Sequence, residues 1–76
     1  DLSFTKLTDA GLEPLCRLPR LRQLELMQTK LTDAAVESLL RARNLEFVDL
    51  PEQISADAAD RLKAGLPRCF VVHLPR

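Results

Sequence analysis

The sequence predicts an α/β fold: a right-handed solenoid with short parallel strands on its concave side and helices on its convex side. Residues 25–33 (ELMQTKLTD) echo residues 1–9 (DLSFTKLTD) at an offset of 24. The stretch LPRLRQLEL (18–26) returns as LPRCFVVHL (66–74), 48 residues on. Each unit joins a strand pattern to a helix pattern, and strands connected through helices must run parallel with right-handed crossovers.

The offset divides the chain into about three units of 24 residues within one domain spanning 1–76. The units are a partial one at 1–20, full ones at 21–44 and 45–68, and a final strand at 69–74. Because the chain begins inside a unit and without Met, we expect it to be a fragment of a longer array.

The first unit contains a predicted helix that starts after Thr8, whose hydroxyl can cap it. Leu12, Leu15 and Leu18 follow at a spacing of three and form its apolar stripe. Pro14 lies within this pattern and removes a backbone donor, so we expect a short helix.

The second unit contains the clearest strand. Leu24 and Leu26 share one face by the period of two, and Gln23 and Glu25 share the other. Thr32 is expected to cap the helix that follows.

The third unit repeats this plan. Ser55 is expected to cap its helix, and Gly65 suits the left-handed position that ends one. In the final strand, Cys69, Val72 and Leu74 are expected in core positions.

The composition narrows the function. Eleven basic residues balance eleven acidic ones, which gives no global attraction to nucleic acid or an anionic membrane. No signal peptide or long apolar run is visible, so a cytoplasmic location is favoured. Cys16 and Cys69 lie two units apart, so we expect two free thiols that behave as small apolar residues.

Nothing in the sequence indicates catalysis. His73 is the only histidine and has no Ser or Cys at a useful position, and the two glycines form no phosphate-binding loop. We expect no enzyme activity, no cofactor and no metal site.

The pattern LxxLxLxxT, followed by LTDA at 31–34, resembles the leucine-rich repeat family. Its residues are Leu21, Leu24, Leu26 and Thr29. The helix starts LTDAGL (7–12) and LTDAAV (31–36) are similar to the cysteine-containing and ribonuclease-inhibitor-like classes, especially to bacterial arrays with a T-x-L-T-D-A-G-L signature. The ending AGLPRCFVVH (64–73) resembles the last repeat of such arrays.

The resemblance implies protein–protein recognition on the concave face and supplies no catalytic residues. Thr5 and Thr29 stand where many members of the family have Asn, and a hydroxyl can form only part of that hydrogen-bond network. In the third unit, where one residue is lost between Leu50 and Ile54 and regained at Gly65-Leu66, Gln53 is the nearest equivalent.

Outward strand positions form columns across the predicted sheet. One column contains Asp1, Glu25, Asp49 and His73, with neighbours about 5 Å apart. It is either an acidic strip for a basic partner residue or a merely solvated strand face. Asp49 and His73 are too few ligands for a metal site.

The neighbouring columns carry apolar residues. One reads Gln23, Phe47 and Val71, and the next includes Met27. Such a cluster indicates a contact surface, contact with a missing flanking segment, or scattered exposure. The candidate partner-binding residues are Gln23, Glu25, Met27, Phe47, Asp49, Val71 and His73.

Arginines recur near the ends of the predicted helices, and Asp9, Asp33 and Asp57 recur near their starts. Complementing the helix dipole explains both sets more simply than a polyanion-binding stripe does.

These patterns lead to two hypotheses. The first is a non-catalytic interaction module that binds a protein or peptide on its concave strand face. The second is a structural segment that caps the C-terminal end of a longer array attached to another domain, which could be an enzyme. Edge-to-edge self-association through the truncated first unit is a further expectation.

Overall fold

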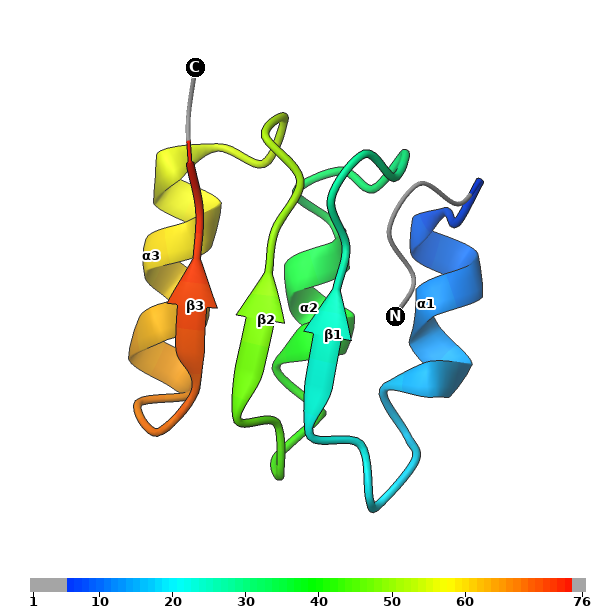
Figure 1. The fold of residues 1–76 in the computed structure, drawn as a ribbon, viewed down its shortest axis with the longest axis vertical. Coiled ribbons are helices and arrows are strands. Elements are labelled where there is room, and N and C mark those ends of the chain that lie inside the picture. Colours follow the sequence, from blue (N-terminus) through cyan, green and yellow to red (C-terminus); the bar gives the residue numbers. More distant parts are fainter. Residues whose placement is uncertain (1–5, 75–76) are drawn as a thin grey trace.

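The computed structural model describes residues 6–74. Strands and helices alternate along these residues, and the strands form one parallel sheet in the order β1-β2-β3 (Figure 1). The elements are α1 (Asp9–Leu15), β1 (Gln23–Glu25), α2 (Ala35–Leu39), β2 (Phe47–Asp49), α3 (Ala56–Gly65) and β3 (Phe70–Val72). The predicted α/β class with short parallel strands is therefore confirmed.

The register between β1 and β2 follows the repeat. Gln23 lies beside Phe47 and Glu25 lies beside Asp49, a separation of 24 residues. The central residues, Leu24 and Val48, are buried. The prediction for these two strands is confirmed in both alignment and orientation.

The register between β2 and β3 is one residue shorter, and the predicted alignment was wrong. Phe47 pairs with Phe70 and Asp49 pairs with Val72, a separation of 23 residues. At the start of β2, the backbone N–H groups of Glu46 and Phe47 both donate to the Arg22 carbonyl, at 2.7 and 3.0 Å. Such a two-against-one arrangement takes up one extra residue.

At the start of β3 the extra residue is missing. The N–H of Phe70 donates to the Glu46 carbonyl at 2.8 Å, directly after the buried Cys69. Because the side-chain period of a strand is two, the missing residue exchanges the two faces of the strand.

The exchange overturns the predicted orientation of the whole final strand. Val71 now lies beside Val48 and packs against the core, while His73 takes the place that Leu50 has after β2. Val72 points the other way, and Leu74, expected in the core, is 69% exposed.

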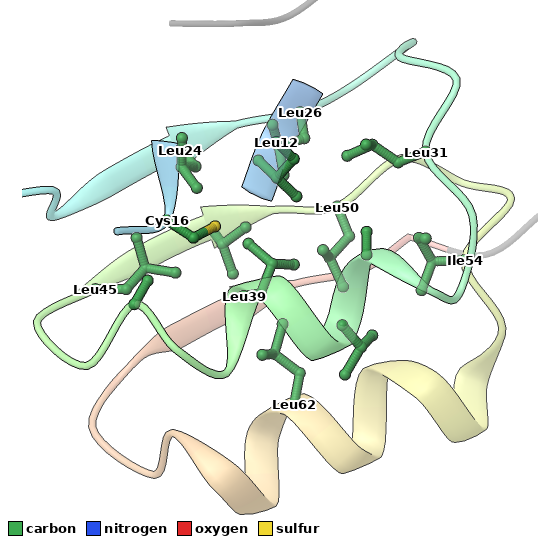
Figure 2. Packing of buried hydrophobic residues seen from close by; sticks show 14 of the residues in the cluster. Leu12, Cys16, Leu24, Leu26, Leu31, Leu39, Leu45, Leu50, Ile54 and Leu62 are labelled. Carbon is green, nitrogen blue, oxygen red and sulfur yellow. The ribbon is translucent and has the colours of Figure 1, made fainter. Parts of the chain in front are cut away.

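The core lies between the sheet and a layer of helices (Figure 2). Leu12, Leu39 and Leu62 from the three helices are fully buried beside residues of the strands. Leu18, expected to extend the stripe of α1, is 53% exposed, because that helix ends at Leu15.

Both cysteines are buried and free, as the sequence predicted. Cys16 follows α1 and Cys69 precedes β3. They contribute to the apolar cluster and form no disulfide.

The helix starts agree only in part with the prediction. The hydroxyl of Ser55 accepts a hydrogen bond of 3.1 Å from the N–H of Ala58, which confirms this cap of α3. Thr8 precedes α1 but makes no side-chain cap. Thr32 forms a turn before α2, and its hydroxyl accepts from the N–H of Ala34 at 3.2 Å.

Gly65 plays a different part from the one expected. No glycine among the described residues has a positive φ angle, so Gly65 is not a left-handed cap. It is the last residue of α3, and a Cβ built on it would come within 2.3 Å of Leu40 Cδ2. The glycine therefore allows α3 to lie close against the chain that follows α2.

Hydrogen bonds to the helix starts link successive units. Asp9 accepts a bond of 2.9 Å from the N–H of Thr32 and a second from its hydroxyl. Asp33 accepts a bond of 2.8 Å from the N–H of Ser55. These two aspartates were expected only to complement helix dipoles, but each also holds the beginning of the next unit.

Amide side chains also link each loop to the corresponding loop of the preceding unit. Asn44 Nδ2 donates to the Pro19 carbonyl at 2.8 Å. Gln53 Nε2 donates to the carbonyls of Thr29 and Leu31, both at 2.8 Å. The partners lie 22 to 25 residues apart, so each bond joins neighbouring units.

Candidate functional site

One face of the sheet carries outward side chains, and we call it the open sheet face. In β1 and β2 the central residue is buried and its neighbours are partly or fully exposed. The buried central residues belong to the same cluster as the helices, so the helices pack on the opposite face. The open sheet face consists of Gln23, Glu25, Phe47, Asp49, Phe70 and Val72.

Two aromatic rings meet on this face. Phe47 and Phe70 are register partners, and their ring centroids are 6.0 Å apart at an interplanar angle of 39°. This tilted arrangement is a favourable aromatic geometry. Phe47 is half-buried, but 67% of Phe70 is exposed. A pair of rings in contact with solvent offers a large apolar area that a partner can cover.

The charged residues of the open sheet face are both acidic. Glu25 and Asp49 lie side by side in register, and the face contains no Lys, Arg or His. Asp49 is half-buried, while Glu25 is exposed. The face therefore combines apolar rings with negative charge, a combination that suits a partner with apolar and basic side chains.

A hollow of about 150 Å³ lies where β1 and β2 end. Its acidic lining comes from Asp49 and Glu52, and two exposed apolar side chains, Met27 and Leu74, also line it. The remaining lining residues are Gln28, Leu50 and Gln53. The hollow adjoins the open sheet face, because Asp49 belongs to both.

The turn beside the hollow is held in place by buried hydrogen bonds. Thr29 is buried, and its hydroxyl donates to the Leu26 carbonyl at 2.8 Å. Gln53 then ties the same turn to the next one. Gln28, between them, adopts a φ angle of 57°, a conformation uncommon for residues other than glycine. Thr29 supplies the partial network expected of a hydroxyl in this place.

Four of the seven predicted site residues, Gln23, Glu25, Phe47 and Asp49, lie on the open sheet face as expected. Met27 is 37% exposed and lines the hollow beside that face.

Val71 and His73 were placed on the wrong face. Val71 packs against the core, and His73 follows it on the same side of the strand. Nε2 of His73 is buried and has no hydrogen-bond partner within residues 6–74. Asp1, the remaining member of the predicted acidic column, lies outside the described residues.

Asp49 and His73, which the sequence already indicated to be too few ligands for a metal site, lie on opposite faces of the sheet. Among residues 6–74, no group of three His, Cys, Asp or Glu side chains is placed to hold a metal ion.

Three apolar residues near the site escaped the sequence interpretation: the exposed Phe70 and Leu74, and the half-buried Val72. The run from Phe70 to Val72 is apolar at each position, so alternation carries no signal for its register. The sequence interpretation did include a one-residue deletion between Leu50 and Ile54, but it restored the residue at Gly65-Leu66 and so kept a separation of 24 residues for the last strand.

The two thiols are unsuited to nucleophilic chemistry. Burial, with a smaller effect of the nearby Glu13 carboxylate, raises the pKa of the Cys16 thiol to about 11. Burial also raises the pKa of the Cys69 thiol. Because the thiolate is the reactive species, both groups are held in their unreactive form at neutral pH.

Several arginines pair with glutamates on the helical side. Glu13 is a partner of both Arg17 and Arg41, and Glu37 pairs with Arg61. Arg41 and Arg17 lie beyond the ends of their helices, whose last turns contain no basic residue. These pairs are solvent-exposed and contribute little to stability.

No protein-family model matches the chain, and a search of curated proteins finds no match. None of the helices within residues 6–74 is long and apolar enough to cross a membrane.

Proposed function

We propose that this chain is a non-catalytic protein-interaction module of the leucine-rich repeat type, which binds a protein or peptide on its open sheet face. In this proposal the three strand and helix units stack as a right-handed solenoid, with the open sheet face on the concave side. The proposal keeps the face that the sequence indicated but changes its membership, since Phe70 and Val72 replace Val71 and His73.

The observation that carries the proposal is the aromatic pair. Phe70 leaves two thirds of its surface in water, although the chain has a core in which other large apolar residues are fully buried. Aromatic side chains that a partner covers commonly dominate binding energy. The short strands are also fixed by pairing on a packed core, so little ordering entropy is lost when a partner binds.

The test is selection from a phage-displayed random dodecapeptide library on the folded protein. We expect the protein to enrich peptides whose affinity falls at least about tenfold when Phe47 and Phe70 are both replaced by Ala. The matched control is Leu18→Ala, which removes an exposed apolar side chain outside the open sheet face and should leave affinity unchanged. Circular dichroism establishes that each variant is folded.

Equal affinity of the enriched peptides for the protein and for the double variant would overturn the assignment of the face. Failure to enrich any peptide would overturn peptide binding itself.

A second candidate function is structural: a segment within a longer array. The hydrogen bonds from Asp9 to Thr32 and from Asp33 to Ser55 favour it, because they tie each unit to the next. Amide hydrogen exchange discriminates this role. Fast exchange concentrated in α1 and β1, together with no effect of the aromatic variants on binding, would support the structural segment over the interaction module.

A further inference from the structure

We infer that the hollow beside Asp49 receives a basic side chain of the partner, so that the recognised segment carries a Lys or Arg next to an apolar residue. This inference rests on the proposed function and adds the chemical class of the partner. The basic side chain would lie at the ends of β1 and β2, beside the part of the open sheet face that carries the aromatic pair.

The position of Asp49 is the first reason. Asp49 both belongs to the open sheet face and lines the hollow, so its carboxylate is accessible from each. It is half-buried, and a partly desolvated carboxylate interacts more strongly with a cation than an exposed one does. Phe47, one ring of the aromatic pair, lies two residues before Asp49 on β2.

The lining of the hollow is the second reason. Met27 and Leu74 supply apolar surface, on which the methylene stem of Lys or Arg can pack while its charged head reaches the carboxylate. Glu52 adds a second carboxylate to the lining, and no basic residue among residues 6–74 lines the hollow. An acidic partner residue is disfavoured here by like charge.

The geometry of the face sets the arrangement of the partner. Asp49 and Phe47 are separated by one residue on β2, so their side chains share a face, about 7 Å apart along the strand. A partner segment that reaches both must therefore present its basic side chain within a few residues of its apolar one. Such a short linear pattern is what a peptide library can reveal.

The experiment compares the peptides selected by the protein with those selected by Asp49→Asn, which removes the charge and keeps the shape. We expect the protein to enrich Lys or Arg beside an apolar residue, and Asp49→Asn to enrich apolar residues without the basic one. Asp57→Asn is the matched control, because Asp57 is an exposed aspartate on α3, outside the open sheet face, and should select the same peptides as the protein.

A selected arginine peptide is then resynthesised with citrulline, which has nearly the shape of arginine without its charge. We expect affinity for the protein to fall about tenfold, and affinity for Asp49→Asn to change less than about twofold. An equal loss with both proteins would overturn the pairing with Asp49.

The outcomes separate the two proposals. Peptides that depend on Phe47 and Phe70 but contain no excess of Lys or Arg would overturn the basic-residue inference and leave the interaction module standing. Enrichment of Asp or Glu would overturn the inference in the same way. If no peptide is enriched, the proposed function fails and the inference fails with it.

Discussion

Asp33 accepts a hydrogen bond of 2.8 Å from the backbone N–H of Ser55, the residue that caps α3. One carboxylate at the start of the α2 turn thus fixes where the next helix begins, 22 residues further on. The sequence placed Asp33 correctly near a helix start but gave no indication of this partner. The bond also makes a pH dependence measurable.

We expect Asp33 to stabilise the fold at neutral pH and to lose that effect in acid. The hydrogen bond from the Ser55 N–H holds the pKa of the Asp33 carboxyl below its ordinary value of 3.8. Because the pKa is lower in the folded state, the carboxylate contributes its full stabilisation at pH values above its pKa in the unfolded state. That stabilisation disappears as the pH falls through the pKa in the folded state. Urea unfolding of the protein and of Asp33→Asn at several pH values measures it.

The difference in midpoint between these two proteins should be present at pH 7 and should shrink below about pH 3.8. Asp57→Asn serves as the control. Asp57 lies at a comparable place near the start of α3, and the structure shows no hydrogen bond from its side chain within residues 6–74. A difference that stays constant into acid would contradict the role assigned to the Asp33 charge.

Two leucines that the sequence pattern placed on helix stripes, Leu62 and Leu18, should differ sharply in their contribution to stability, because only Leu62 is buried. Leu62 is fully buried, so Leu62→Ala should lower the free energy of unfolding by about 2–5 kcal/mol. Leu18→Ala removes the same atoms from a side chain that is 53% exposed and should change it by less than about 0.5 kcal/mol. Guanidinium unfolding gives both values, and similar losses would mean that Leu18 packs in the core as its spacing first indicated.

His73 should be a position at which an apolar substitution stabilises the protein. It occupies the place of Leu50 in the preceding unit, and its buried Nε2 lacks a hydrogen-bond partner within residues 6–74. His73→Leu removes that polar atom and should raise the free energy of unfolding by roughly 1 kcal/mol. His73→Gln keeps a polar side chain and should give no gain. A loss of stability in the leucine variant would contradict the inward orientation.

Cys16 should react slowly with Ellman's reagent in the folded protein. Its pKa of about 11, against 9.0 for an ordinary thiol, lowers the thiolate fraction about hundredfold near neutral pH. Burial adds a steric barrier, so guanidinium should release fast labelling. The Cys69→Ser variant isolates this thiol. Equal rates with and without denaturant would show that Cys16 is accessible in the folded state.

The limits of sequence interpretation follow from particular residues. The register of β1 against β2 could be predicted because Leu24 and Val48 alternate with mostly polar neighbours. The register of β3 could not, because Phe70, Val71 and Val72 suit either face. The aromatic pair depends on that register, so two of the six residues of the open sheet face, Phe70 and Val72, could not be predicted from the pattern.

Hydrogen bonds between units were also invisible. Asp9 and Gln53 are polar residues that simple rules place at a helix start or in a loop, and only the fold brings Thr32 and Thr29 to them. The buried leucines, in contrast, were predictable because the 24-residue pattern repeats them.

Because one residue is missing at the start of β3, the chemistry of the open sheet face depends on the number of residues that precede this strand. Inserting one codon between Cys69 and Phe70 would turn the strand over, bringing Val71 and His73 outward and sending Phe70 and Val72 inward. A single-codon insertion or deletion, without any change of residue type, would therefore exchange an aromatic binding surface for one that carries a titratable imidazole. Evolution or a designer could use the same step to change partners while leaving β1 and β2 untouched.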